Sequence, residues 1–182
     1  MTIGNTSALD MALRMFTQSE DYVLSDEYTF ATAVETAKPM GVQFVGMKMD
    51  KAGMCPDNLR EILDGWDPKA HGGSRRPFVL YLIPTGQNPT GATQGLARRR
   101  EIYKVAQDYD LIILEDDPYY FMQMDPYSPA GTADSAKSRR CFNPGSRRSE
   151  SVGAIQTSRR ALGPRRLFSM AHAYPRGVYR ST

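Results

Sequence analysis

The stretch FVLYLIPTGQNPTG, residues 78–91, decides the fold class, because a nearly all-apolar run leads directly into a loop that holds two prolines. A short apolar run of this kind is typical of a strand in a parallel sheet, where both faces are covered. A second such run, Leu111 to Leu114, follows residues 96–109, whose apolar side chains recur at helical spacing. Strands that alternate with helices predict an open α/β sheet with right-handed crossovers.

The residues before this stretch continue the alternation. Helical spacing or strand alternation predicts helices over about 8–16, 29–37 and 57–63 and strands over 22–24 and 42–47. We expect the side chain of Asn5, Thr6 or Ser7 to cap the first helix, because a short polar side chain can accept from an unpaired amide. The arginine run 98–100 is expected to lie on a solvated helix face.

The composition of the 182-residue chain, 41% hydrophobic and 24% charged, is that of a globular protein. No apolar run approaches the roughly 18 residues that cross a bilayer, and the N-terminus lacks the pattern of a secretory signal. Two cysteines cannot build a disulfide framework, and two histidines argue against a zinc site. We therefore expect a reduced, cytoplasmic protein that has no membrane contact and no bound metal.

Charge divides the chain into two unlike parts. Residues 1–127 carry 12 Lys and Arg against 18 Asp and Glu, whereas residues 128–182 carry 11 against 2. The second part holds four Arg-Arg pairs and too few aliphatic residues to offset chain entropy. We predict an ordered unit over 1–127 and a mostly disordered basic tail over 128–182. Arginine clusters can bind phosphates of RNA or DNA, so nucleic-acid binding by the tail is the alternative function, less favoured because no aromatic-interleaved motif accompanies it.

Two polar segments follow the buried strands, at the edge where open α/β sheets bind ligands. The loop Pro84 to Gly91 has the composition of an ordinary turn, but its two prolines stiffen it enough to hold Asn88 toward a bound group. After the next strand, Asp117 followed by Pro118 is typical of a helix start, which leaves Asp116 without a role. A buried carboxylate needs a partner, and a pyridinium N–H is a suitable one.

The segments IPTGQNPTGAT, RRREIYKVAQDYDLIILEDDPYYFMQM and GNTSALDMALRMF resemble pyridoxal-phosphate-dependent aminotransferases of fold type I, class I/II. The joint occurrence of Asn-Pro-Thr-Gly and Asp-Asp-Pro-Tyr-Tyr at this separation carries the resemblance, which covers roughly residues 3–127. It is closest to aromatic-amino-acid, kynurenine and 2-aminoadipate aminotransferases, those of fungi especially. The resemblance implies a fragment of the large domain, a partial three-layer α/β/α unit with a mostly parallel sheet. It also implies transfer of an amino group from an aromatic or related amino acid to a 2-oxo acid.

By position, the resemblance implies that six residues bind the cofactor pyridoxal 5'-phosphate: Asn5, Thr6, Phe30, Asn88, Asp116 and Tyr119. The two residues that open the first helix would hold the phosphate, where helix-terminal amides favour an anion. The phenylalanine would stack on the pyridine ring, and simple core packing is its alternative role. The asparagine and the tyrosine would hydrogen-bond the 3-oxygen of the ring, and the aspartate would pair with the ring nitrogen.

Transamination in the family also needs a lysine in a Ser-x-x-Lys or Ser-Phe-Ser-Lys setting, shortly followed by Pro-Gly and an arginine. Beyond Tyr127 this chain has one lysine, Lys137, and Pro144-Gly145-Ser146-Arg147 follows after too long an interval. We do not expect Lys137 to reach the site, because no strand-like segment delivers it there. We therefore predict no catalytic lysine, low or no activity, and a truncated or frame-shifted reading of a longer gene. Complete family members are homodimers, an expectation that we do not extend to this chain.

Overall fold

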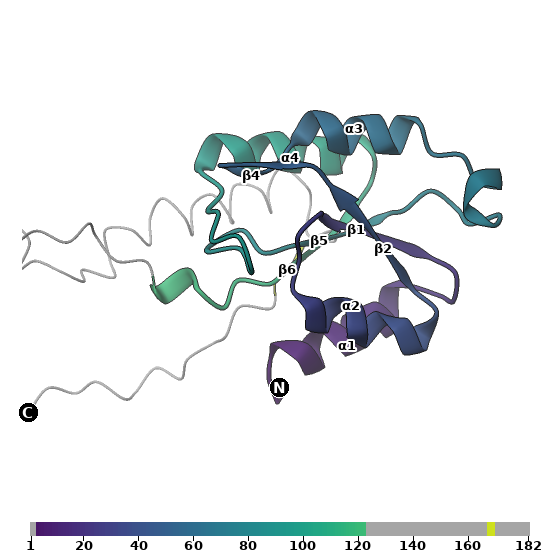
Figure 1. Ribbon diagram of the computed structural model, residues 1–182, viewed down its shortest axis with the longest axis horizontal. Coiled ribbons are helices and arrows are strands. Elements are labelled where there is room, and N and C mark those ends of the chain that lie inside the picture. The colour runs from purple at the N-terminus through teal and green to yellow at the C-terminus, as the bar shows by residue number, and fades with distance from the viewer. Residues whose placement is uncertain (1–2, 123–166, 170–182) are drawn as a thin grey trace, which may run out of the picture.

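The computed structural model describes residues 3–122 and 167–169, and its central feature is a five-stranded sheet (Figure 1). The strand order is β2-β1-β5-β6-β7, and every neighbouring pair in it is parallel. The strands are β1 Tyr22–Asp26, β2 Gln43–Met47, β5 Val79–Leu82, β6 Ile112–Glu115 and β7 Leu167–Ser169. Lys137 and most of the predicted tail over 128–182 lie outside the described residues.

Helices cover both faces of this sheet, so the described part has three layers (Figure 1). The helices are α1 Asn5–Phe16, α2 Ala31–Ala37, α3 Pro56–Asp64 and α4 Leu96–Asp108. Side chains of α1 and α2 pack with Val23 and Val79, whereas those of α3 and α4 pack with Leu24 and Leu80. Because successive strand residues point to opposite faces, neighbouring residues of one strand enter different cores. The predicted α/β/α architecture with a parallel sheet is confirmed.

The order of the strands places a ligand crevice at one point of the sheet. From β1 the chain crosses to β2 on one side, whereas β5 lies on the other side of β1 and is followed outward by β6. Strand order therefore reverses between β1 and β5, and ligands of open α/β sheets bind at the carboxyl ends of strands at such a reversal. The loops that carry Asn88, Asp116 and Tyr119 leave β5 and β6 at this edge.

Short elements were not predicted from the sequence. An antiparallel pair, β3 Met49–Asp50 and β4 Gly53–Met54, and the 3₁₀ helices Lys38–Met40, Lys69–His71 and Tyr120–Met122 each span too few residues to show a period. Arg98 holds the β3-β4 pair against α4: its guanidinium donates to Asp50 Oδ2 at 2.7 Å and to the Met54 carbonyl at 2.7 Å. The expectation of a solvated face is therefore wrong for Arg98, because its side chain is used in tertiary contacts.

The strand β7 is a further difference from the prediction, which placed no strand in residues 128–182. Leu167 to Ser169 pair in parallel with Ile113 to Glu115 of β6. A Leu-Phe-Ser run is too short to signal a strand by itself, and pairing with the buried β6 supplies the hydrogen bonds that define it.

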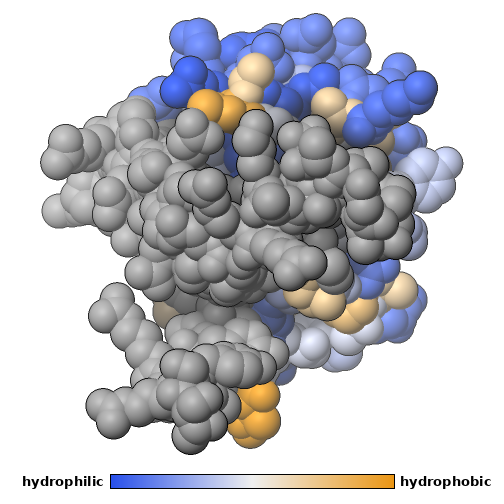
Figure 2. Space-filling view, turned by 90° about the vertical axis from the view of Figure 1, so that its left-hand side faces the viewer, coloured by the Kyte–Doolittle hydropathy of each residue, from blue (hydrophilic) through white to orange (hydrophobic). Residues whose placement is uncertain are grey.

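The coloured surface in Figure 2 is mostly hydrophilic, with hydrophobic residues at separate places. The exposed large apolar side chains among the described residues are Ile3, Met11, Met15, Tyr28, Leu96 and Met122. Apolar residues scattered singly over a surface are normal in folded proteins. None of the described helices has the length and apolar character that crossing a membrane requires.

Candidate functional site

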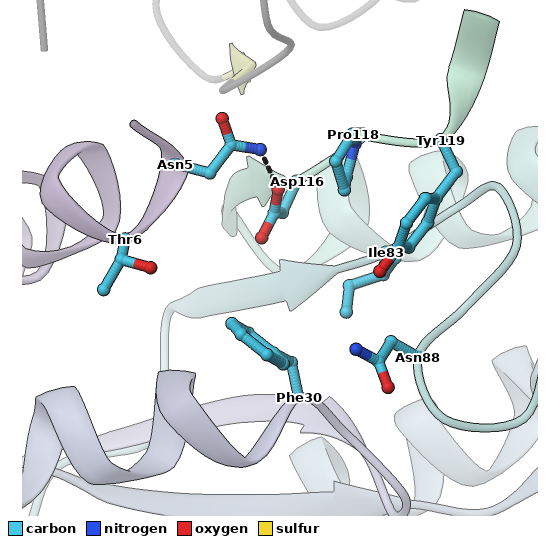
Figure 3. Close-up of a pocket in the computed structure, with 8 residues that line it drawn as sticks. All are labelled: Asn5, Thr6, Phe30, Ile83, Asn88, Asp116, Pro118 and Tyr119. Carbon is cyan, nitrogen blue, oxygen red and sulfur yellow. Dashed lines mark hydrogen bonds between the residues drawn. The ribbon is translucent and has the colours of Figure 1, made fainter. Parts of the chain in front are cut away.

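A cavity of about 260 Å³ opens at the carboxyl edge of the sheet (Figure 3). Its walls are Asn5, Thr6, Phe30, Ile83, Asn88, Asp116, Pro118 and Tyr119. All six residues that the resemblance singled out are among them, and they come from the start of α1 and from the loops after β1, β5 and β6. The fold thus gathers residues that are far apart in the sequence around one space.

Asp116 lies at the inner end of this cavity and is held from three directions. Only 5% of its surface is exposed. Its backbone N–H donates to the Leu82 carbonyl at 2.8 Å, which continues the pairing of β5 and β6. Its Oδ1 accepts from Asn5 Nδ2 at 2.6 Å, and its Oδ2 accepts from the Tyr81 hydroxyl at 2.9 Å. Donors on both oxygens favour the ionised carboxylate, because hydrogen bonds to a charged form stabilise that form.

Tyr81 was not singled out from the sequence, because it stands inside the apolar run of β5 and there resembles a core residue. Its side chain is fully buried. Burial, together with the neighbouring Asp116, raises the pKa of the Tyr81 hydroxyl far above its usual value. The hydroxyl therefore stays protonated and acts as a hydrogen-bond donor. A phenol in an otherwise aliphatic buried strand is the signal that was available, since a buried tyrosine hydroxyl needs a partner.

The predicted cap of the first helix is wrong. Helix α1 already begins at Asn5, Gly4 precedes it, and no side chain caps its first turn. The Asn5 amide points instead toward Asp116, whereas the Thr6 hydroxyl points toward the cavity (Figure 3). The cap fails because all three candidates lie inside the helix, and the Asn5 side chain donates through Nδ2 to the Asp116 carboxylate.

The opposite wall of the cavity is formed by three side chains from separate loops (Figure 3). The Phe30 ring enters from the segment before α2, and the Asn88 amide enters from the loop after β5. The Tyr119 hydroxyl points inward on the same side as Asn88. An aromatic face and two hydrogen-bonding groups therefore stand across the cavity from Asp116.

The loop that carries Asn88 is tied down on both sides. Gln87 is 2% exposed, and its Nε2 donates to the Tyr28 carbonyl while its Oε1 accepts from the Thr90 hydroxyl at 2.6 Å. On the other side, Arg99 Nη2 donates to Thr85 Oγ1 at 3.0 Å. The expectation of a solvated face is therefore wrong for Arg99 too. The two prolines alone do not hold the loop in place, because these side-chain hydrogen bonds also connect it to the loop after β1 and to α4.

Two more acids are buried beside the cavity without lining it. Asp26, at the end of β1, is 1% exposed and neither carboxylate oxygen has a hydrogen-bond partner. Burial raises the pKa of Asp26 to about 7, against a smaller lowering by the Gln87 amide. Burial likewise raises the pKa of Asp117 to about 6. The helix-start interpretation of Asp117 is wrong, because the next helix begins at Tyr120 and not at Pro118, and the Asp117 side chain is buried next to Thr85.

The fold and the cavity together define the class of protein to which this part of the chain belongs: a three-layer α/β protein with a carboxylate, an aromatic ring and an amide around one ligand crevice. Comparison with known proteins narrows the class. An aromatic amino acid aminotransferase of Schizosaccharomyces pombe is 50% identical over 127 residues, which are 70% of this chain and 27% of that protein. No known family model matches the chain.

Solved structures give the same result. The aminotransferase Aro8 from Candida albicans has a TM-score of 0.66 and 42% identity, covering 75% of this chain and 27% of that one. The kynurenine aminotransferase of Pyrococcus horikoshii, crystallised with PMP, has a TM-score of 0.56 and 33% identity, covering 63% and 28%. The matched part of this chain therefore belongs to the pyridoxal-phosphate-dependent aminotransferases of fold type I. The chain spans about a quarter of the length of these relatives.

The cavity fits the ring of such a cofactor in several respects. Phe30 and Ile83 offer apolar surface, Asp116 offers a buried carboxylate, and Asn88 and Tyr119 offer hydrogen-bond donors. One family feature is missing from the described residues, since none of the side chains that line the cavity there belongs to a lysine.

Proposed function

We propose that this cavity binds pyridoxal 5'-phosphate, or its amine form pyridoxamine 5'-phosphate, without a covalent bond. The observation that carries the proposal is Asp116: a carboxylate that is 5% exposed and held by two donors faces a cavity whose other wall has an aromatic ring. Burying a charged group is costly unless it is paired. A protonated pyridine nitrogen supplies the opposite charge and the donor in one group.

The ring of the cofactor is expected to lie between Phe30 and the end of β5. An aromatic side chain offers a ring both apolar area and a stacking surface. Asn88 and Tyr119 then donate to the 3-oxygen of the ring, the amide through its N–H and the phenol through its O–H. With Asp116 as counter-ion the ring nitrogen stays protonated, and the bound cofactor supplies an electron sink for amino-acid chemistry.

The phosphate is expected at the start of α1. The first amides of a helix have no partner within the helix, and here no side chain caps them. Together with the helix dipole they favour an anion. Because the Asn5 side chain is bonded to Asp116, we propose that Asn5 contributes its backbone N–H to the phosphate and that Thr6 adds its hydroxyl.

The reaction that we propose is the family's transfer of an amino group from an amino acid to a 2-oxo acid. An aromatic donor is favoured by the relative in Schizosaccharomyces pombe, which is named for aromatic amino acids. Because no lysine lines the cavity in the described part of the chain, we expect binding of the cofactor with low turnover or none.

The test is a titration of the whole chain with pyridoxamine 5'-phosphate, followed by calorimetry. Asp116→Asn keeps the shape of the side chain and removes its charge, so affinity should fall about 10- to 100-fold, as expected for a lost hydrogen bond to a charged group. The same substitution at the exposed Asp57 is the control and should leave affinity unchanged. Equal affinities of the parent and Asp116→Asn would contradict the proposed site.

The non-covalent part of the proposal has its own test. Pyridoxal 5'-phosphate is added, any Schiff base is reduced with borohydride, and modified lysines are mapped by mass spectrometry. We expect that no lysine is labelled in an amount that matches the amount of bound cofactor. Stoichiometric labelling of Lys137 would show a covalent site and would overturn the expectation of low turnover.

A further inference from the structure

The hydroxyl of Tyr81 is one of the two donors to Asp116, and the proposed function assigns it no separate role. Tyr81 lies in β5, and its side chain is fully buried among apolar side chains of the α1 and α2 layer. The Phe44 ring packs edge-on against it, with centroids 6.1 Å apart and an angle of 75°. The hydroxyl reaches Asp116 Oδ2 at 2.9 Å. Close packing of this kind holds the ring in one orientation, so the hydroxyl has a fixed place beneath the carboxylate.

The two donors to Asp116 differ in how firmly they are held. Asn5 is half-buried at the first residue of a helix, next to the cavity. Tyr81 is in the middle of the sheet and has no space to turn away. Burial and the nearby carboxylate raise the pKa of Tyr81 far above its usual value, so its hydroxyl stays protonated and remains a hydrogen-bond donor at neutral pH. Each carboxylate oxygen accepts more than one hydrogen bond, so Asp116 can hold both donors and still accept from the cavity.

We infer that Tyr81 is a positioning residue for the cofactor: its hydroxyl orients the Asp116 carboxylate and favours its ionised form, so that the shared proton stays on the ring nitrogen. The inference rests on the proposed function. When a pyridine nitrogen and a carboxylate share one proton, a donor to the carboxylate lowers its basicity and shifts the proton toward nitrogen. Without the Tyr81 donor the Asp116 carboxylate is more basic than it is in the parent, so it takes a larger share of the proton from the ring nitrogen.

The chain contains a matched control for this tyrosine. Tyr103, in α4, is 9% exposed and its hydroxyl donates to Glu115 Oε2 at 2.7 Å. It belongs to the other core, on the opposite face of the sheet from Tyr81. Tyr103→Phe therefore removes a buried hydrogen bond between a tyrosine hydroxyl and a carboxylate, as Tyr81→Phe does. It leaves the hydrogen bonds to Asp116 in place.

The experiment measures the proton on the cofactor itself. Pyridoxamine 5'-phosphate labelled with ¹⁵N in the ring is bound to the whole chain, and the ¹⁵N shift is recorded at pH 7. The parent and Tyr103→Phe should give the same signal, between the two limits and closer to the protonated one. In Tyr81→Phe the signal should move toward the unprotonated limit, by an amount that corresponds to a change of about 10-fold in proton partition.

Each outcome decides one of the two claims. If Tyr81→Phe binds the probe with the ¹⁵N shift of the parent, Tyr81 is a core side chain only and the inference is wrong, while the proposed function stands. If the parent chain does not bind the probe, the proposed function fails and the inference fails with it. A change of equal size in the ¹⁵N shift of Tyr103→Phe would also overturn the inference. The effect would then come from a general loss of packing in the protein.

A second variant covers the case in which Tyr81→Phe does not fold. Fluorinated tyrosine placed at position 81 keeps the ring and the hydroxyl but makes the hydroxyl a stronger donor. The ¹⁵N signal should then move further toward the protonated limit, opposite to the shift in Tyr81→Phe. An unmoved signal overturns the inference.

Discussion

Asp26→Asn should stabilise the folded chain more at alkaline than at acidic pH. Asp26 ends β1 with 1% of its surface exposed, and neither of its carboxylate oxygens has a hydrogen-bond partner. Burial raises the pKa of Asp26 from 3.8 to about 7, with a smaller opposing effect of the Gln87 amide. Asparagine has nearly the same shape and does not ionise, so it removes the pH-dependent part of this cost.

The sign follows from proton binding in the two states. Well below pH 3.8 Asp26 is protonated in both the folded and the unfolded chain, so it does not lower the free energy of unfolding. Between pH 3.8 and about 7 the unfolded chain has released the proton while the folded chain still holds it, so stability falls as pH rises. At about 1.4 kcal/mol per pH unit, the cost of burying Asp26 in the folded chain is on the order of 4 kcal/mol at pH 8 and about 1–2 kcal/mol at pH 5. The gain from Asp26→Asn should thus be about 3 kcal/mol larger at pH 8.

Urea unfolding at pH 5 and pH 8 measures this difference, with the fluorescence of Trp66, the single tryptophan, as the signal. The buried amide of the new asparagine carries its own cost, but that cost is the same at both pH values and cancels in the comparison. Asp57→Asn at an exposed position corrects for the change in net charge. If Asp26→Asn changes the free energy of unfolding by the same amount at both pH values, burial does not raise the pKa of Asp26 and the reasoning is wrong.

Two further substitutions test the parts of the fold that support the site. Gln87→Ala releases the loop of Asn88 from the Tyr28 carbonyl, so affinity for pyridoxamine 5'-phosphate in the same titration should fall roughly 5-fold; an unchanged affinity would show that the loop holds itself. Gly46→Ala would place a Cβ 2.7 Å from the Cα of Glu27, between the ends of β1 and β2, and should lower the free energy of unfolding by about 1–3 kcal/mol. Urea unfolding measures that loss, and parent-like stability would mean that the two strand ends separate freely.

Much of the fold could be predicted because its signals are local. The apolar run 78–83 predicted β5, and the structure forms that strand from Val79 to Leu82. The helical spacing of residues 96–109 predicted α4, which runs from Leu96 to Asp108. A run that is buried on both faces, or an amphipathic period, appears within a dozen residues and needs no knowledge of distant parts of the chain.

The candidate site was predicted only in part, and by two kinds of inference. Asp116 and Asn88 stood out by their own chemistry, as polar residues just after buried strands. The roles of Asn5, Thr6 and Tyr119 came from the resemblance to a family. Gln87 and Arg99 were missed, because nothing local distinguishes a side chain that fixes a loop from one that faces water.

What the sequence by itself determined is the order of helices and strands and the chemical kinds of group at the sheet's edge. Only the tertiary structure decided which groups meet. It joined Asn5 of α1 and Tyr81 of β5 to the carboxylate of Asp116, and it removed Asp26 from water. It also added β7 to the sheet. The physical reason is that periodicity and propensity act between near neighbours, whereas hydrogen-bond partners and burial depend on how separate elements pack.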